Sequence, residues 1–208
     1  MHVITAASCV TGKRTDEIRI FAGSNTLSLC DKYDVDTWLI HNDWAYKNGQ
    51  PTLFSFMDIA IIRLTKKVDE RKVRPALISP KLLKHFYGLD GTLAGWSGTD
   101  DETRTKIMQT SMTKILTKDE CYFEVPNQYM RSAIRNQEIL CSESNQYFSH
   151  GYEGGPILYG TNIFIGVNLQ KSPGVTDTKY KRLNFYTGLE NHRKFFYYAT
   201  AGAQFSVA

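Results

Sequence analysis

The feature that most constrains the fold is a series of short apolar runs, rich in β-branched and aromatic residues, that turn signals separate. Runs of this length and composition predict β-strands, and many short strands joined by Gly-rich turns are typical of barrels and sandwiches. The turn signals include Gly-Ser-Asn at 23–25, Lys-Asn-Gly-Gln-Pro at 47–51 and Ser-Pro-Gly at 172–174. The predicted strands cover residues 2–5, 18–21, 37–40, 59–64, 91–96, 157–159 and 163–167. The sequence therefore predicts an all-β protein.

Two stretches have the pattern of helices. A short helix is predicted around Lys118–Cys121, and a terminal helix over Leu189–Ala199. The terminal stretch alternates between apolar positions, which would face the protein, and polar positions, which would face solvent. The polar positions are Glu190, His192, Arg193 and Lys194. We expect this helix to dock on the β-structure.

Composition excludes several classes of protein. The 208 residues, 42% of them hydrophobic, can form one large domain or two small ones with a sizeable core. The net charge of +4 comes from basic residues mixed with acids, so we expect no nucleic-acid partner. No window approaches the roughly 18 apolar residues that cross a bilayer, so no membrane partner is expected. The four cysteines lack the C-x-x-C spacing of a zinc site, and neither metal nor cofactor is expected.

Three motifs occur in one order along the chain. They are TAASC at residues 5–9, DIAI at residues 58–61 and GYEGGP at residues 151–156. They resemble the T-A-A-H-C, D-I-A-L and G-D-S-G-G-P motifs of chymotrypsin-like (trypsin family) serine proteases. The serine of the first motif precedes the aspartate of the second by 50 positions, and that aspartate precedes the glutamate of the third by 95. The corresponding family gaps are about 45 and about 93, so the resemblance covers nearly the whole chain.

The resemblance implies two antiparallel six-stranded β-barrels of the chymotrypsin/trypsin type, with a cleft between them and a C-terminal helix. We place an incomplete N-terminal barrel at 1–80, a C-terminal barrel at 81–187, and the helix and tail at 188–208. The family has further N-terminal strands before the TAASC strand, and we expect these to be absent from this sequence.

The resemblance also implies a cysteine pairing. Cys121 and Cys141 match the disulfide of the family's second barrel, and the usual partner of Cys9 would lie in the absent segment. Cys30 has no family counterpart, so it would either pair with Cys9 or stay free.

The triad positions lack the residues that catalysis needs. A serine nucleophile requires an imidazole base and a carboxylate that orients the base. Here the base position is Ser8, whose hydroxyl accepts protons poorly near pH 7. The nucleophile position is Glu153, whose charge would repel a developing oxyanion in the turn formed by Gly151 and Glu153. Only Asp58, the orienting carboxylate, is retained, so no functional catalytic residue is predicted.

The specificity pocket is predicted to be blocked. In active relatives an aspartate before the nucleophile binds the new amino terminus after activation, and Tyr152 stands there. Aromatic residues occupy the pocket floor, and a long lysine side chain would project into its mouth. The predicted blocking residues are Tyr147, Phe148, Tyr152, Leu169, Gln170 and Lys171.

These inferences predict a pseudoprotease that acts by binding proteins. The chain is similar to the inactivated protease paralogues of parasitic mites, relatives of the group 3 mite allergens. That likeness implies an extracellular antagonist or decoy of host defence proteins such as complement, although the sequence carries no signal peptide.

Two alternatives belong to other functional classes. One is a hydrolase with non-standard chemistry around Glu153, assisted by His150 or Asp58. The other is attachment to anionic polysaccharide through a basic cluster that Asp69 and Glu70 interrupt, for which a solvated loop is the simpler interpretation. The cluster consists of Lys66, Lys67, Arg71, Lys72 and Arg74.

Overall fold

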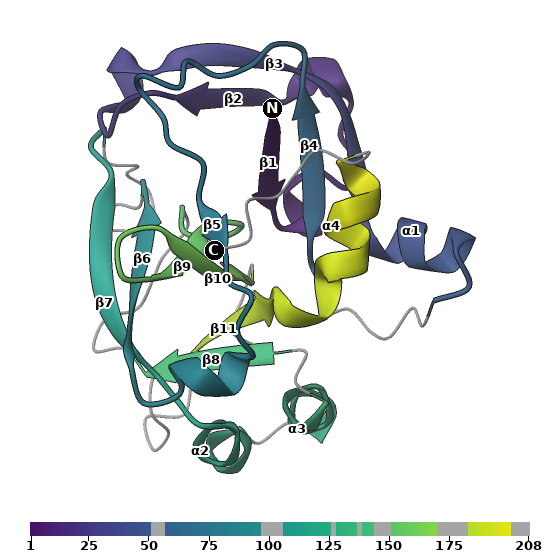
Figure 1. The fold of residues 1–208 in the computed structure, drawn as a ribbon, viewed down its shortest axis with the longest axis vertical. Coiled ribbons are helices and arrows are strands. Elements are labelled where there is room, and N and C mark those ends of the chain that lie inside the picture. The colour runs from purple at the N-terminus through teal and green to yellow at the C-terminus, as the bar shows by residue number, and fades with distance from the viewer. Residues whose placement is uncertain are drawn as a thin grey trace.

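A computed structural model describes residues 1–50, 57–96, 106–125, 128–136, 139–143, 151–169 and 183–200. In these ranges the chain is mostly β-structure, arranged as an N-terminal sheet and a C-terminal barrel with a short helix at the end (Figure 1). The all-β prediction is confirmed.

The N-terminal sheet has four antiparallel strands in the order β1-β4-β3-β2. Their bounds are β1 His2–Thr5, β2 Arg19–Ala22, β3 Asp31–Ile40 and β4 Ala60–Leu64. Four of the five β4 residues are buried, which explains the nearly continuous apolar run in the sequence. Thr5 of β1 pairs with Ala60 of β4, so the segments that follow Thr5 and precede Ala60 lie side by side.

The C-terminal barrel closes through six strands in the order β11-β8-β7-β6-β9-β10, with β10 pairing back to β11. Their bounds are β6 Asp90–Gly95, β7 Gln109–Ile115, β8 Ile139–Glu143, β9 Pro156–Tyr159, β10 Ile163–Asn168 and β11 Leu183–Gly188. The two-residue strand β5, Leu77–Ile78, pairs in parallel with β10. The proposed domain boundaries at residues 80 and 187 stay predictions.

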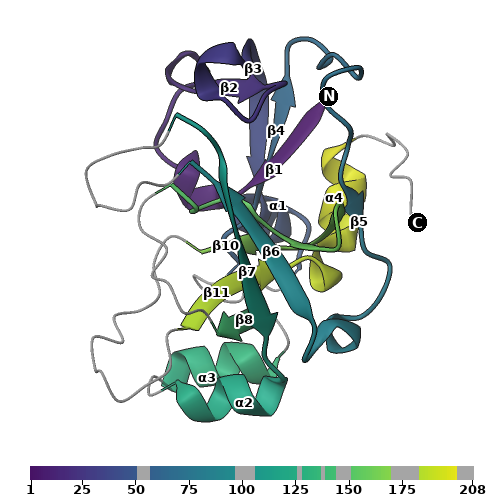
Figure 2. The ribbon, with the colours of Figure 1, turned by 90° about the vertical axis from the view of Figure 1, so that its left-hand side faces the viewer.

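The described ranges also contain four α-helices and five 3₁₀-helices. The α-helices are α1 His41–Lys47, α2 Lys118–Glu124, α3 Gln128–Arg135 and α4 Arg193–Ala199. The 3₁₀-helices are η1 Ala7–Cys9, η2 Thr15–Glu17, η3 Leu27–Leu29, η4 Leu83–Phe86 and η5 Glu190–His192. Figure 2 shows α2 and α3 side by side below β8.

The predicted terminal helix forms with one correction. Its first part is the 3₁₀ turn η5, and regular α-helix begins at Arg193. His192, expected among the solvent-facing positions, is only 1% exposed. The change from a 3₁₀ turn to an α-helix shifts the angular phase of the side chains, so a single helical period misplaces His192.

The disulfide between Cys121 and Cys141 joins α2 to β8, which confirms the predicted pair. Both cysteines belong to a buried cluster between α2, α3 and the barrel. Cys9 and Cys30 are free thiols, and no bond joins them.

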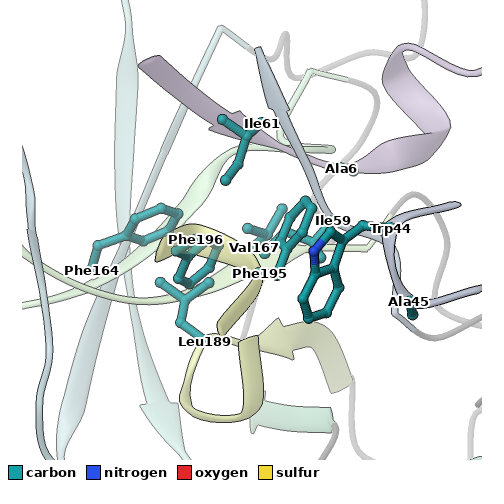
Figure 3. Packing of buried hydrophobic residues seen from close by; sticks show 10 residues of the cluster. All are labelled: Ala6, Trp44, Ala45, Ile59, Ile61, Phe164, Val167, Leu189, Phe195 and Phe196. Atoms are coloured by element: carbon teal, nitrogen blue, oxygen red, sulfur yellow. The ribbon is translucent and has the colours of Figure 1, made fainter. Parts of the chain in front are cut away.

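An apolar cluster fills the space between the N-terminal sheet, α1, α4 and the barrel (Figure 3). We call these ten residues the central cluster, and they come from both halves of the chain. They are Ala6, Trp44, Ala45, Ile59, Ile61, Phe164, Val167, Leu189, Phe195 and Phe196. Burial of this apolar surface is the main term that holds α4 against the N-terminal sheet.

The two halves also touch at Gly154, in the turn before β9. Its backbone has a φ of +72°, and a Cβ there would lie 2.5 Å from Thr5 Oγ1 and 2.8 Å from Cys9 Sγ. Thr5 Oγ1 donates a hydrogen bond to the Gly154 carbonyl at 3.3 Å. Only glycine fits both the conformation and the space.

We therefore expect Gly154→Ala to destabilise the fold by about 3 kcal/mol, because left-handed strain and a steric clash add together. Gly160→Ala is the matched control, since Gly160 has a φ of +63° and open space around its Cβ position. It should cost only about 1 kcal/mol. Urea unfolding of the two variants measures the difference, and equal losses would show that the contact with Thr5 and Cys9 does not constrain the turn.

Candidate functional site

Ser8 and Asp58 form the first half of the candidate site. Ser8 lies in η1 after β1, and Asp58 lies two residues before β4, so the β1–β4 pairing brings them together. Asp58 Oδ1 accepts a hydrogen bond from the Ser8 N–H at 2.6 Å, and Oδ2 accepts one from Ser8 Oγ at 2.7 Å. The carboxylate holds residue 8 at two points, but the group it orients is a hydroxyl.

The turn that contains Glu153 forms the second half. Gly151 has a φ of +117°, and its N–H donates to Glu153 Oε2 at 2.7 Å. In trypsin-like enzymes the N–H groups at the positions of Gly151 and Glu153 bind the oxyanion of the reaction intermediate. In this chain a carboxylate of the turn itself already occupies one of those two donors.

Backbone hydrogen bonds fix the turn to the barrel. The Gly154 N–H donates to the Asn168 carbonyl at 2.9 Å, and the Asn168 N–H donates to the Gly155 carbonyl at 2.8 Å. The Asn168 side-chain amide donates to the Tyr152 carbonyl at 3.1 Å. The conformation of the turn therefore depends on backbone groups and Asn168, and needs no reactive side chain at position 153.

Cys9 is a residue near the site that sequence reasoning did not assign to it. Its thiol is free, and Sγ lies 4.0 Å from the Glu153 carbonyl oxygen. Burial of the sulfur raises the thiol pKa, and the charges of Asp58 and Glu153 raise it further, whereas a hydrogen bond with Thr5 acts in the opposite direction. A thiol is nucleophilic only as thiolate, so Cys9 does not replace the missing nucleophile near neutral pH. The sequence did contain a signal for this residue, because Cys9 directly follows Ser8, which occupies the base position.

Tyr152 is a core residue of the barrel. Its side chain is 7% exposed and packs in a cluster with Leu93 and Ile157. A Cβ at Gly95 would lie 2.8 Å from the Tyr152 ring. Burial raises the pKa of Tyr152. A buried aromatic side chain therefore occupies the position where active relatives hold the carboxylate that binds the amino terminus.

Of the other residues predicted to block the pocket, Leu169 is half-buried against the disulfide cluster, and its N–H donates to the Phe185 carbonyl at 3.0 Å. The remaining four lie outside the described residues, and so does His150. They are Tyr147, Phe148, Gln170 and Lys171. The blocked pocket stays a prediction.

Four histidines lie in the described ranges, and none of them bonds Asp58. His2 is in β1 opposite Arg63, and the ring of exposed His85 contacts the Leu82 carbonyl. His41 and His192 are buried together between α1 and α4. Within the described ranges, no group of three or more His, Cys, Asp or Glu residues is arranged to hold a metal ion.

The basic cluster is partly neutralised by its neighbours. Lys72 Nζ lies 2.8 Å from Asp31 Oδ2, and Arg71 Nη2 lies 2.8 Å from Asp69 Oδ2. Hydrogen bonds from Arg71 lower the pKa of Asp69 to about 2. Lys66 lies over the ring of Tyr33, with its Nζ 5.3 Å from the ring centroid. These contacts favour the solvated-loop interpretation over a polysaccharide site.

In the part of the chain that the structure describes, no helix is both long and apolar enough to span a bilayer.

The fold is similar to the crystal structure of the scabies mite inactivated protease paralogue S-D1. The TM-score is 0.72 at 16% sequence identity, and the match covers 98% of this chain and 84% of that one. At this identity the likeness concerns the fold. A search of curated proteins found no match. The family model described as Trypsin matches residues 1–195, and the chain therefore belongs to the trypsin family.

Proposed function

We propose that this chain is a catalytically inactive member of the trypsin family, a pseudoprotease that acts by binding other proteins. The observation that carries the proposal is the hydrogen bond from the Gly151 N–H to the Glu153 carboxylate. An oxyanion formed at this turn would have to displace a negative group that is tethered beside it. The turn is thus complementary to its own side chain rather than to a transition state.

The Ser8–Asp58 pair supports the same conclusion. General-base catalysis needs a group that takes up a proton near the working pH, and a hydroxyl does not. Ser8 makes two hydrogen bonds with Asp58, one from its N–H at 2.6 Å and one from its hydroxyl at 2.7 Å, so the pair is a fixed structural unit. Loss of the nucleophile or the base alone costs a serine protease about 10⁶-fold in turnover. Both groups are replaced here.

Retention of the scaffold favours a binding role. The turn keeps its glycines because of the positive φ at Gly151 and Gly154 and the close contact at Gly154. A chain that presents the surface of a protease without its chemistry can occupy the partners of an active protease and leave them uncleaved. The structurally similar S-D1 protein is itself named an inactivated protease paralogue.

The role that fits best is that of a secreted antagonist or decoy of host defence proteases such as those of complement. An extracellular location agrees with the Cys121–Cys141 disulfide, because such bonds persist in oxidising compartments. The alternative of a hydrolase with chemistry around Glu153 is less well supported, because the described contacts of this carboxylate include its own turn.

We expect the folded chain to hydrolyse no peptide or ester substrate, and Ser8→His/Glu153→Ser to remain nearly inert. The double variant would restore the triad side chains, but position 152 would still hold a tyrosine in place of the aspartate of active relatives. The predicted blocked pocket would also still exclude a substrate side chain. Hydrolysis of a chromogenic peptide library, with trypsin as positive control, measures both rates. Robust turnover by the double variant would overturn the prediction of a blocked pocket.

Comparison of the unmodified chain with Glu153→Ala and Glu153→Gln distinguishes a pseudoprotease from the alternative hydrolase. If the unmodified chain does hydrolyse a substrate, and both variants lose that activity, Glu153 has a chemical role and the pseudoprotease proposal fails. If no form is active at any pH tested, the proposal is supported.

The folded chain should also delay complement-mediated lysis of sensitised erythrocytes in serum in a dose-dependent way. Trypsin with its nucleophile replaced by alanine is the fold-matched control and should have no effect. Unchanged lysis, together with no retention of serum proteins on the immobilised chain, would contradict the proposed binding role.

A further inference from the structure

His41 and His192 are far apart in sequence, but their side chains form a buried pair. His41 is the first residue of α1, and His192 is the last residue of η5, directly before α4. Their ring centroids lie 4.6 Å apart, edge to face, and the residues are 5% and 1% exposed. The pair is therefore part of the contact between α1 and the C-terminal helix.

The surroundings of the pair are apolar. The His41 ring lies 5.6 Å from Trp44 and 5.2 Å from Phe195, measured between centroids. The His192 ring lies 6.4 Å from Phe196. All three aromatic residues belong to the central cluster, which Figure 3 shows packed around α4.

One nitrogen of each ring has no hydrogen-bond partner among the described residues. His192 Nδ1 contacts the Gly188 carbonyl at 2.8 Å, so it carries the proton in the neutral ring and Nε2 does not. His192 Nε2 and His41 Nδ1 are buried with no hydrogen-bond partner among the described residues. A second proton on His192 would thus place a charge on a buried nitrogen with no group to receive its hydrogen bond.

Among the described residues, no carboxylate compensates that charge. In the elements packed around the pair, the charged side chains are either exposed or bonded elsewhere. Asp58 bonds Ser8, Glu190 accepts from the Leu83 N–H, Arg193 donates to the Pro80 carbonyl and Arg63 bonds Asp36. Asp43, Lys47 and Lys194 are exposed, and β10 has no titratable residue.

Protonation is accordingly unfavourable in the folded state. Burial, followed by the like charge of His41, lowers the pKa of His192 to about 4 from its ordinary 6.5. Burial also lowers the pKa of His41, while the Asn42 side chain acts in the opposite direction. Because the pKa is lowered on folding, the unfolded or undocked chain binds more protons between pH 6.5 and about 4. Stability of the docked state is therefore full above pH 6.5 and falls as the pH drops through this window.

We propose that the His41–His192 pair is a pH-sensitive latch, which holds α4 against α1 and the N-terminal sheet at neutral pH and releases it in acid. Release would expose Phe195, Phe196 and the rest of the central cluster to solvent. The proposal does not rest on the proposed binding function or on the chemistry of the triad side chains.

Hydrogen exchange of the α4 amides, followed from pH 7.5 to 4 and corrected for intrinsic rates, tests the latch. Protection of Arg193–Ala199 should fall by about 150-fold, because at pH 4 the undocked His192 ring is almost fully protonated whereas the docked ring, with its pKa lowered to about 4, is only half protonated. In His192→Gln, whose amide can still donate to the Gly188 carbonyl but gains no charge, the fall should be less than about 10-fold. His85→Gln, at an exposed histidine, is the matched control and should behave like the unmodified chain.

The same fall in His192→Gln as in the unmodified chain would overturn the latch, since carboxylates elsewhere would then cause the acid response. A second measurement needs no variant. In an NMR titration of the unmodified chain, one imidazole should titrate near pH 4, together with the loss of α4 protection. If α4 stays protected down to pH 4, or if its loss of protection is not accompanied by the titration of a buried imidazole, the proposal is wrong.

Discussion

The close approach of the Gly154 backbone to Thr5 and Cys9 is the contact on which the candidate site depends. It seats the turn of the barrel against the N-terminal sheet, and it uses a positive φ and the absence of a Cβ. Because these are properties of the backbone, the geometry of a catalytic turn can persist when its reactive side chains are replaced. Selection for folding alone would retain the glycines of this motif, but it would not require a serine at position 153.

The sequence was informative where local chemistry decides the structure. The runs at 2–5, 59–64 and 163–167 correspond to β1, β4 and β10, all rich in β-branched residues. The helix predicted at Lys118 is fixed by a capping box, in which Thr117 and Glu120 bond each other's backbone N–H groups. The fold class and the disulfide were likewise accessible, through motifs whose spacing reflects the whole family.

Tertiary context decided the features that sequence reasoning missed. β7 and β11 contain polar residues such as Thr113 and Thr187 that are buried inside the barrel, so neither strand shows a simple alternation. The hydrogen bond between the Gly151 N–H and Glu153 depends on a rotamer and on the turn geometry. The motif GYEGGP identified the altered chemistry of this position, but it could not show that the carboxylate bonds its own turn.

The partly buried Ser8–Asp58 pair and the buried His41–His192 pair differ in how completely their polar atoms are hydrogen-bonded. In the Ser8–Asp58 pair every contact is a complete hydrogen bond, which makes a former reaction centre into a fixed structural element. In the His41–His192 pair each ring keeps an unpartnered nitrogen within the described structure, which leaves that contact sensitive to protonation. The central cluster lies between the two pairs, since Ala6 is two residues before Ser8 and Ile59 directly follows Asp58. Loosening of the cluster in acid would therefore reach the segments that carry the triad positions, without any change in the triad side chains themselves.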